Sequence, residues 1–315
     1  MDCKEMRITR RESLALIVGA AGTALAPGLC RAEAHGTVLR VAVSVETLAG
    51  ANISDARAAY RVWVAEAAHQ FATNIWEVDP EIFLPSDRMV QGIRQGTISC
   101  FGVTAPELLK VAEFTDPDQL LLQDIMADGM EYVLLVHNSS RFKTIADLRG
   151  AQIVSHLHRE MVLLNAWLGT MLAANNLGQA DRFFGGQTLR DNLNQVVLPV
   201  FFHRMDAACL ARRDWETAVE LNPQLGRDLR PLAVSPKLVP IAIGFRRGCN
   251  AEARKNMIDS ILRVSTVPAG QQIVALYQSH GFVVKPFSVM KGTLEMVRQF
   301  ERVSAQPARA RKGQS

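Results

Sequence analysis

The stretch EYVLLVHNSSRFKTIADLRGAQIVSHLHREM, residues 131–161, carries the alternation of strand and helix signals that decides the fold. Its apolar segment Tyr132–Val136 is rich in β-branched residues and stops at a polar turn, which predicts a buried strand. One helical turn over Lys143–Leu148 ends at a glycine and leads to a second predicted strand, Ala151–Val154. Apolar residues then recur at intervals of three and four, so we expect a helix with Ser155 as its N-cap. Such a strand-to-helix passage leaves free backbone N–H groups, which favour an anion.

The residues before this stretch predict three further strands, each followed by a helix start. These strands are expected at Val38–Val45, Glu81–Leu84 and Thr97–Val103. Repeated strand-to-helix passages imply a parallel sheet with right-handed crossovers, and ligands on such sheets bind beyond the carboxyl ends of the strands. Four hydroxyl side chains are therefore expected at one edge of the sheet as candidate ligand-binding residues: Ser44, Thr47, Ser86 and Thr104. Thr104 also begins a capping box, Thr104-Ala-Pro-Glu107.

A family resemblance follows from the order of these signals. The hydrophobic strand, the motif S-x-F-K-T-I-A-D-L-R-G, the short strand and the helix resemble the hinge region of type II periplasmic binding proteins, in particular the PhnD/SsuA/transferrin family. The resemblance extends from about Val38 to about Val303. It implies an α/β protein of two lobes, each a mostly parallel sheet flanked by helices, joined by a two-crossing hinge. Lobe 1 is expected to comprise residues 35–130 plus 237–304, and lobe 2 residues 131–236 with the hinge crossings.

The same resemblance implies a periplasmic solute-binding component of an ABC importer that captures a small, anionic, phosphate- or phosphonate-like ligand by hinge closure. Phosphonate binders of the family have a Ser/Thr-rich run where this chain has Ser155-His156-Leu157-His158-Arg159, so His156 and His158 are expected to bind the anion beside Ser155. Asp206 stands in a segment that resembles a cleft-lining strand, and Tyr132 stands near the hinge. We expect a monomer with an ABC permease as partner and with no cofactor.

Three alternatives remain open at this stage. The loaded protein could report to a membrane sensor instead of a permease. The spacing of His156, His158 and Met161 would also suit copper or zinc, since imidazole and thioether are ligands for these metals. An enzyme is not expected, because the sequence contains no nucleophile elbow, no H-E-x-x-H and no P-loop motif.

The N-terminal residues 1–34 predict an export signal peptide. A basic stretch with Thr9-Arg10-Arg11 precedes an apolar run over Leu14–Ala26, and Ala32-Glu33-Ala34 is a cleavage site, so cleavage is expected after Ala34. The paired arginines resemble a twin-arginine signal, with a Sec signal as the alternative. Residues 305–315 are expected to form a disordered tail.

Composition supports an ordinary globular protein. The 315 residues are 48% hydrophobic and 21% charged, which suffices for two cores. A formal net charge of +4 gives no case for nucleic-acid binding. Beyond the predicted leader, Cys100, Cys209 and Cys249 are too few for a disulfide framework, and we expect Cys100 and Cys209 to be buried as small hydrophobes. One bridge among the three stays possible in an oxidising compartment.

Overall fold

The computed structural model describes residues 39–48, 52–70, 76–276 and 278–305. The predicted signal peptide and residues 306–315 of the predicted tail lie outside the described residues. Residue 305 ends a helix. Within the described ranges, no helix combines the length and the apolar character needed to span a membrane.

The first sheet has the strand order β11-β4-β10-β3-β1-β2. β1 pairs in parallel with β2 and β3, whereas β10 and β11 run antiparallel to their neighbours. Its strands are β1 (Leu39–Ser44), β2 (Trp76–Leu84), β3 (Cys100–Thr104), β4 (Leu120–Gln123), β10 (Ile241–Phe245) and β11 (Phe282–Lys285). The later strand β10 therefore lies between β3 and β4.

The second sheet has the order β7-β6-β8-β5-β9. β6 pairs in parallel with β7 and β8, and β5 runs antiparallel to β8 and β9. Its strands are β5 (Tyr132–His137), β6 (Gln152–His156), β7 (Gly186–Arg190), β8 (Ala207–Ala211) and β9 (Leu229–Val234). Both sheets are thus mixed, and the prediction of mostly parallel sheets is wrong in this respect. The strands that follow a crossing, β5 and β10, run antiparallel to their neighbours, and so does β11 at the edge of the first sheet.

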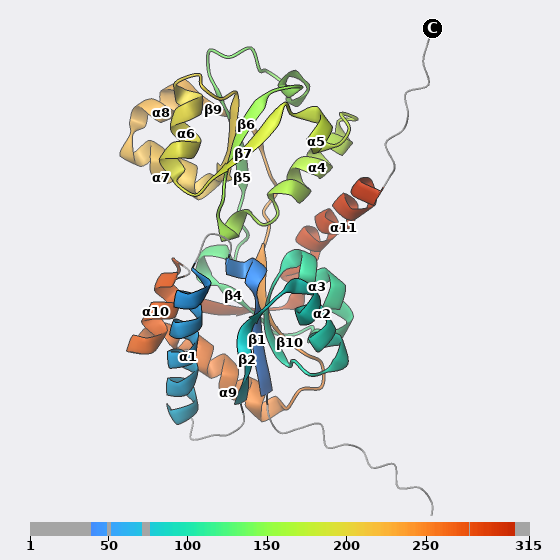
Figure 1. The fold of residues 1–315 in the computed structure, drawn as a ribbon, viewed down its shortest axis with the longest axis vertical. Helices are drawn as coiled ribbons and strands as arrows, with labels where there is room; N and C mark the ends of the chain where they lie inside the picture. The colour runs from blue at the N-terminus through green and yellow to red at the C-terminus, as the bar shows by residue number, and fades with distance from the viewer. Residues whose placement is uncertain (1–38, 49–51, 71–75, 277, 306–315) are drawn as a thin grey trace, which may run out of the picture. The chain divides into compact units, whose positions relative to one another are not determined.

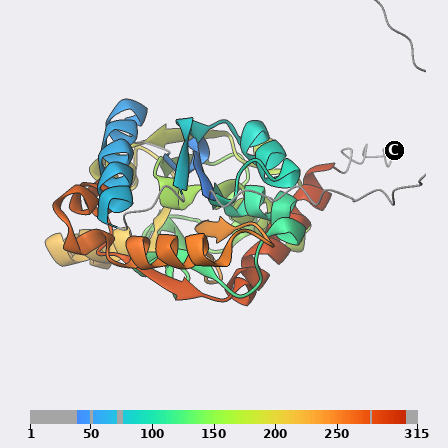
Figure 2. The same cartoon turned by 90° about the horizontal axis from the view of Figure 1, so that it is seen from below.

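Helices cover both faces of each sheet because successive side chains of a strand point to opposite faces and both sets are apolar. In the first sheet, Val41 and Val43 belong to the core under α1, α9 and α10, whereas Ala42, Phe101 and Val103 belong to the core under α2, α3 and α11. The helices attached to this sheet are α1 (Ile53–Gln70), α2 (Ser86–Gln95), α3 (Ala105–Val111), α9 (Ala251–Leu262), α10 (Pro268–Leu276) and α11 (Lys291–Ala305). Figure 1 and Figure 2 both show α1 beside α10 on one face, with α2 and α3 on the other.

The second sheet is covered in the same way. Val133 and Leu135 of β5 pack in the core with α6, α7 and α8, and Leu134 and Val136 pack on the opposite face with α4 and α5. These helices are α4 (Leu164–Ala174), α5 (Ala180–Phe183), α6 (Leu193–Phe201), α7 (Arg212–Leu221) and α8 (Pro223–Asp228). Short 3-10 helices complete the described elements: η1 (Val45–Leu48), η2 (Ala112–Phe114), η3 (Asp124–Met126), η4 (Ile145–Leu148), η5 (Arg159–Met161), η6 (Val264–Thr266) and η7 (Phe287–Met290).

Two chain crossings connect the sheets and are hydrogen-bonded to each other. Met130 and Leu238 form an antiparallel bridge, with N–H to O distances of 2.8 and 2.9 Å. Next to it, the backbone N–H of Tyr132 donates to Ser235 Oγ at 2.8 Å, and the N–H of Ser235 donates to the carbonyl of Tyr132 at 2.9 Å. The two crossings therefore form a short two-stranded ribbon between the sheets.

Candidate ligand-binding site

The carboxyl end of the first sheet brings Ser44 and Thr104 together around a buried carboxylate, that of Glu107. Ser44 Oγ donates to Glu107 Oε1 at 2.5 Å. The backbone N–H and the hydroxyl of Thr104 donate to Glu107 Oε2 at 2.9 and 2.8 Å. All three residues are buried. The two hydroxyls that were predicted to bind a ligand are therefore hydrogen-bonded to the Glu107 carboxylate.

Thr47 and Ser86 lie at the same edge in other roles. Thr47 is buried in η1, and its hydroxyl donates to the carbonyl of Ser44 at 2.8 Å. Ser86 is the half-buried first residue of α2, whose N-cap is Pro85. Ser86 follows Leu84, which pairs with Ser44 in the sheet, so it belongs to the predicted edge.

Ser155 is not a helix N-cap, and that prediction is wrong. Strand β6 continues through Ser155 to His156, where parallel pairing with β7 and β8 satisfies the backbone. The next α-helix, α4, begins only at Leu164 and has no side-chain cap. Ser155 Oγ accepts a hydrogen bond from Gln187 Nε2 at 3.1 Å. An anion site made by a helix start at Ser155 is therefore absent from this described part of the chain.

His156 and His158 lie side by side at the carboxyl end of β6, with stacked rings whose centroids are 5.4 Å apart. Both ring nitrogens of His156 have protein partners, Asp214 Oδ2 at 3.2 Å and the carbonyl of Asp191 at 3.3 Å. Burial lowers the pKa of His156, but the hydrogen bond and charge of Asp214 outweigh it, so the pKa is raised. Burial and the neighbouring Arg159 lower the pKa of His158 to about 4.

The next two residues form a buried ionic cluster with Arg213, which lies just beyond β8. Arg159 is 3% exposed and donates through Nη1 to Gln123 Oε1, at the end of β4, at 2.8 Å. Glu160 is fully buried, and its Oε1 accepts from Arg213 Nη2 and lies 3.8 Å from Arg159 Nη2. Burial raises the pKa of the Glu160 carboxyl against the opposing charges of Arg213 and Arg159. The cluster thus joins the ends of β4, β6 and β8.

Glu160 Oε2 in this cluster and the neighbouring His158 Nδ1 are buried without a hydrogen-bond partner. These two atoms lie 4.0 Å apart. Buried polar atoms are nearly always hydrogen-bonded, and exceptions point to a water or a ligand. A hollow of about 300 Å³ lies beside His158, lined by both histidines, Met161, Asn165 and Gln187 among others. The pair can accept a hydrogen bond from a small guest.

Tyr132 supports this cluster from the hinge. Its fully buried hydroxyl donates to the backbone carbonyl of Glu160, and its ring packs against Trp167 with centroids 6.1 Å apart. Burial raises the pKa of the phenol, so it remains a donor. Tyr132, which was predicted to contact the ligand, therefore holds η5 in position instead.

Asp206 lies apart from the other candidates. Its Oδ2 accepts from the backbone N–H of Gln152 at 2.7 Å, at the amino ends of β6 and β8. His156 and Arg212 mark the carboxyl ends of the same strands. The structure therefore does not bring Asp206 to the edge where ligand binding was predicted.

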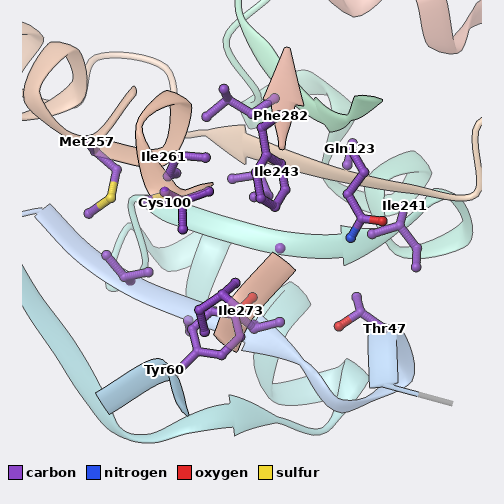
Figure 3. A pocket seen from close by; sticks show the side chains of 17 residues that line it. Thr47, Tyr60, Cys100, Gln123, Ile241, Ile243, Met257, Ile261, Ile273 and Phe282 are labelled. Carbon is purple, nitrogen blue, oxygen red and sulfur yellow. The ribbon is translucent and has the colours of Figure 1, made fainter. Parts of the chain in front are cut away.

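A cavity of about 50 Å³ lies between the first sheet and α1, α9 and α10. Figure 3 shows its lining, with Thr47 and Gln123 at one end and Cys100 and Met257 toward the other. The remaining lining side chains are almost all apolar. Cys100 and Cys209 are buried as predicted, and the three cysteines of the described residues are free thiols.

The metal alternative finds no support. In the described ranges, no group of three or more His, Cys, Asp and Glu side chains could hold a metal ion. The rings of His156 and His158 are stacked with an interplanar angle of 15°, and the nitrogens of His156 are engaged by Asp214 and Asp191. Met161 lines the hollow, but because both nitrogens of His156 are hydrogen-bonded to the protein, His156, His158 and Met161 do not offer three available metal ligands.

The profile of one protein family matches this chain. The family is described as ABC transporter, phosphonate, periplasmic substrate-binding protein, and the match spans residues 76–285, more than half of the chain.

Solved structures share the fold at low sequence identity. A Xanthomonas citri protein with bound chloride is 16% identical over 85% of this chain and 99% of its own, with a TM-score of 0.57. Prochlorococcus marinus PhnD1 with methylphosphonate is 16% identical over 84% and 99%, with a TM-score of 0.55. A binding protein of an ABC phosphonate transporter from Pseudomonas aeruginosa is 12% identical over 87% and 91%, with a TM-score of 0.54. The predicted two-lobed α/β fold is confirmed.

A curated relative of another kind matches only in part. The tRNA pseudouridine synthase C of Haemophilus ducreyi is 30% identical over 141 residues, which is 42% of this chain and 55% of that protein. The chain spans about half the length of this relative. A similarity restricted to part of both chains does not carry an activity from one to the other.

Proposed function

This chain belongs to the family of periplasmic phosphonate-binding proteins of ABC transporters, and from that premise we propose that it captures a phosphonate at the Arg159–Glu160 cluster. As a member of this family, it is a periplasmic substrate-binding protein that delivers a small-molecule ligand to a membrane permease. We further propose that it acts as a monomer without turnover of the ligand, after cleavage of the signal peptide following Ala34.

The contact between Arg159 and Gln123 supports an anionic ligand. The guanidinium donates one N–H to a neutral amide oxygen at 2.8 Å while the residue is almost completely buried. An oxyanion in place of that amide would replace a neutral acceptor by a charged one, and charge-assisted hydrogen bonds are roughly twice as strong. Arg159 can therefore gain from an anion without losing its ion pair with Glu160.

The unpartnered pair Glu160 Oε2 and His158 Nδ1 is the observation that carries the choice of phosphonate. A singly protonated phosphonate has acceptor oxygens for Arg159 and one O–H donor for this pair. A sulfonate has acceptor oxygens alone, so it would leave the buried acceptors unsatisfied, at a cost of about 1 to 3 kcal/mol. Methylphosphonate, the ligand in the Prochlorococcus marinus structure, has this combination of groups.

Closure between two lobes is the proposed means of capture. We assign residues 35–130 plus 237–304 to one lobe and residues 131–236 to the other, as expected from the sequence. Arg159 and Glu160 come from the second assigned lobe and Gln123 from the first, so a ligand held among them would interact more strongly with a closed form. The hydrogen-bonded crossings at Met130 and Ser235 would provide the hinge.

Calorimetric titration with methylphosphonate and methanesulfonate tests this function. The wild type is expected to bind methylphosphonate at least tenfold more tightly. Arg159→Gln should weaken binding of both anions by about 10- to 100-fold, because a charged hydrogen bond contributes about 1.5 to 3 kcal/mol. Glu160→Gln should reduce the preference for phosphonate, because the substituted amide accepts less strongly.

Arg212→Gln is the matched control. This arginine is 46% exposed, pairs with Glu131 and Glu216, and lies one residue from Arg213. Its affinity for methylphosphonate should stay within twofold of the wild type. Equal loss in the Arg159 and Arg212 variants, or no preference between the two anions in the wild type, would show that the cluster does not select a phosphonate.

A further inference from the structure

The cavity between the first sheet and α1, α9 and α10 is a feature that anion binding alone does not use. It lies beside β1 and β3 and is covered by Tyr60 of α1, Met257 and Ile261 of α9 and Ile273 of α10. None of the described side chains that line it is charged. Burial raises the pKa of the Cys100 thiol, which is therefore neutral as well. A charged head group would lose its solvation in such a space without compensation.

Thr47 and Gln123 supply the polar end of the cavity (Figure 3). Gln123 accepts the hydrogen bond of Arg159, and η1, which carries Thr47, contacts η5, which carries Arg159 and Glu160. The apolar space and the ionic cluster thus share Gln123 as a common wall. A molecule with its anionic group at Arg159 has an apolar chamber next to that group.

We propose that this cavity is the second half of the ligand site and holds a short unbranched alkyl substituent of the phosphonate. The proposal rests on the proposed function and narrows it to alkylphosphonates. A cavity of about 50 Å³ has room for roughly three or four water-sized groups, since one such group needs about 10 to 15 Å³ on this measure. The chamber therefore fits a chain of three to four carbons beyond phosphorus.

The length of the chain is the variable that tests this inference. Binding constants are measured by calorimetry for methyl-, ethyl-, propyl-, butyl- and hexylphosphonate with the mature protein. Affinity should rise about fourfold for each carbon from methyl to propyl or butyl, which corresponds to about 0.8 kcal/mol for each buried methylene. It should then level off or fall for hexylphosphonate, because the chamber is full.

Variants that change the size of the chamber should shift the preferred chain length. Val43→Ile adds one carbon to the lining, so the optimum should become one carbon shorter. Ile273→Val removes one carbon and should make it one carbon longer. Val133→Ile is the matched control, because Val133 is also buried, in a strand of the second sheet, and does not line the cavity. Melting curves confirm that each variant is folded.

The outcomes separate the two proposals. If methylphosphonate binds and affinity is flat or falls from methyl to butyl, the chamber does not receive the chain, and the proposed function stands without it. An unchanged optimum in both the Val43→Ile and Ile273→Val proteins also overturns the chamber. If neither inorganic phosphate nor any phosphonate of the series binds, the proposed function fails and the alkyl proposal fails with it.

Discussion

At the scale of single residues, the roles of His156 and His158 could not be deduced from the sequence, because they depend on burial and on contacts with residues distant in the chain. The sequence places both beyond a strand, whereas in the structure His156 is the last residue of β6 and only His158 lies beyond it. Asp214, which is distant in the chain, raises the pKa of His156. Burial lowers the pKa of His158. Glu160, the most buried charge of the cluster, was not predicted as a site residue, although it directly follows the H-x-H-R motif.

The low pKa of His158 predicts an acid-labile contribution to stability. The ordinary pKa of 6.5 falls to about 4 on folding, so between these values the unfolded chain binds a proton that the folded protein does not. Stability should therefore fall as the pH drops from 6.5 toward 4. His158→Gln removes this loss, which urea denaturation at several pH values measures. The raised pKa of His156 stabilises the folded protein at low pH, and this stabilisation is lost as the pH rises through the raised value. His156→Gln should therefore lower the free energy of unfolding at low pH and have a smaller effect at higher pH.

At the scale of elements, most boundaries follow from local signals. The predicted strand Tyr132–Val136 agrees with β5 to within one residue, and Gly96 ends α2 with φ at 80°, a left-handed conformation that favours glycine. The helix start at Ser155 was misplaced because pairing with β7 and β8 extends the strand, and pairing partners are not visible in a local pattern. The capping box of Thr104 was recognised, but its acidic member also binds Ser44, 63 residues away.

Ser44→Ala tests whether the Glu107 network is structural. The substitution removes a 2.5 Å hydrogen bond to a buried carboxylate, so the free energy of unfolding should fall by about 1.5 to 3 kcal/mol. The affinity for methylphosphonate should change less than twofold. Ser54→Ala, at an exposed position in α1, should alter stability by less than about 0.5 kcal/mol. A tenfold loss of affinity with unchanged stability would assign the hydroxyl of Ser44 to the ligand instead.

At the scale of the whole molecule, the order of elements predicted two sheets and two crossings. The strand order could not be deduced, since β4, β7 and β11 are short and lack a distinctive alternation, and they complete the sheets through long-range pairing. The register in which the two crossings pair could not be deduced from the sequence either. It places Gly129, with φ at 76°, against Lys237 of the other crossing.

Gly129→Ala should disturb the hinge more than ordinary backbone strain would. A Cβ at this position would lie 2.8 Å from Lys237 Cβ, whereas at Gly150, where φ is 77°, nothing lies within 4 Å. Gly150→Ala should therefore cost about 1 kcal/mol from strain alone. Gly129→Ala should cost about 1 to 3 kcal/mol more, because the second crossing must move. Thermal denaturation compares the two, and equal losses would show that the crossings are not tightly packed.

The insertion of β10 between β3 and β4 has a consequence for how the chain is made on the ribosome. All strands of the second sheet lie within residues 132–234, a continuous stretch that can assemble as soon as it emerges. The first sheet lacks an interior strand until residues 241–245 have been synthesised. The first sheet, whose synthesis begins first, is therefore completed last. While the second sheet folds, the early strands of the first sheet have no β10 to pair with.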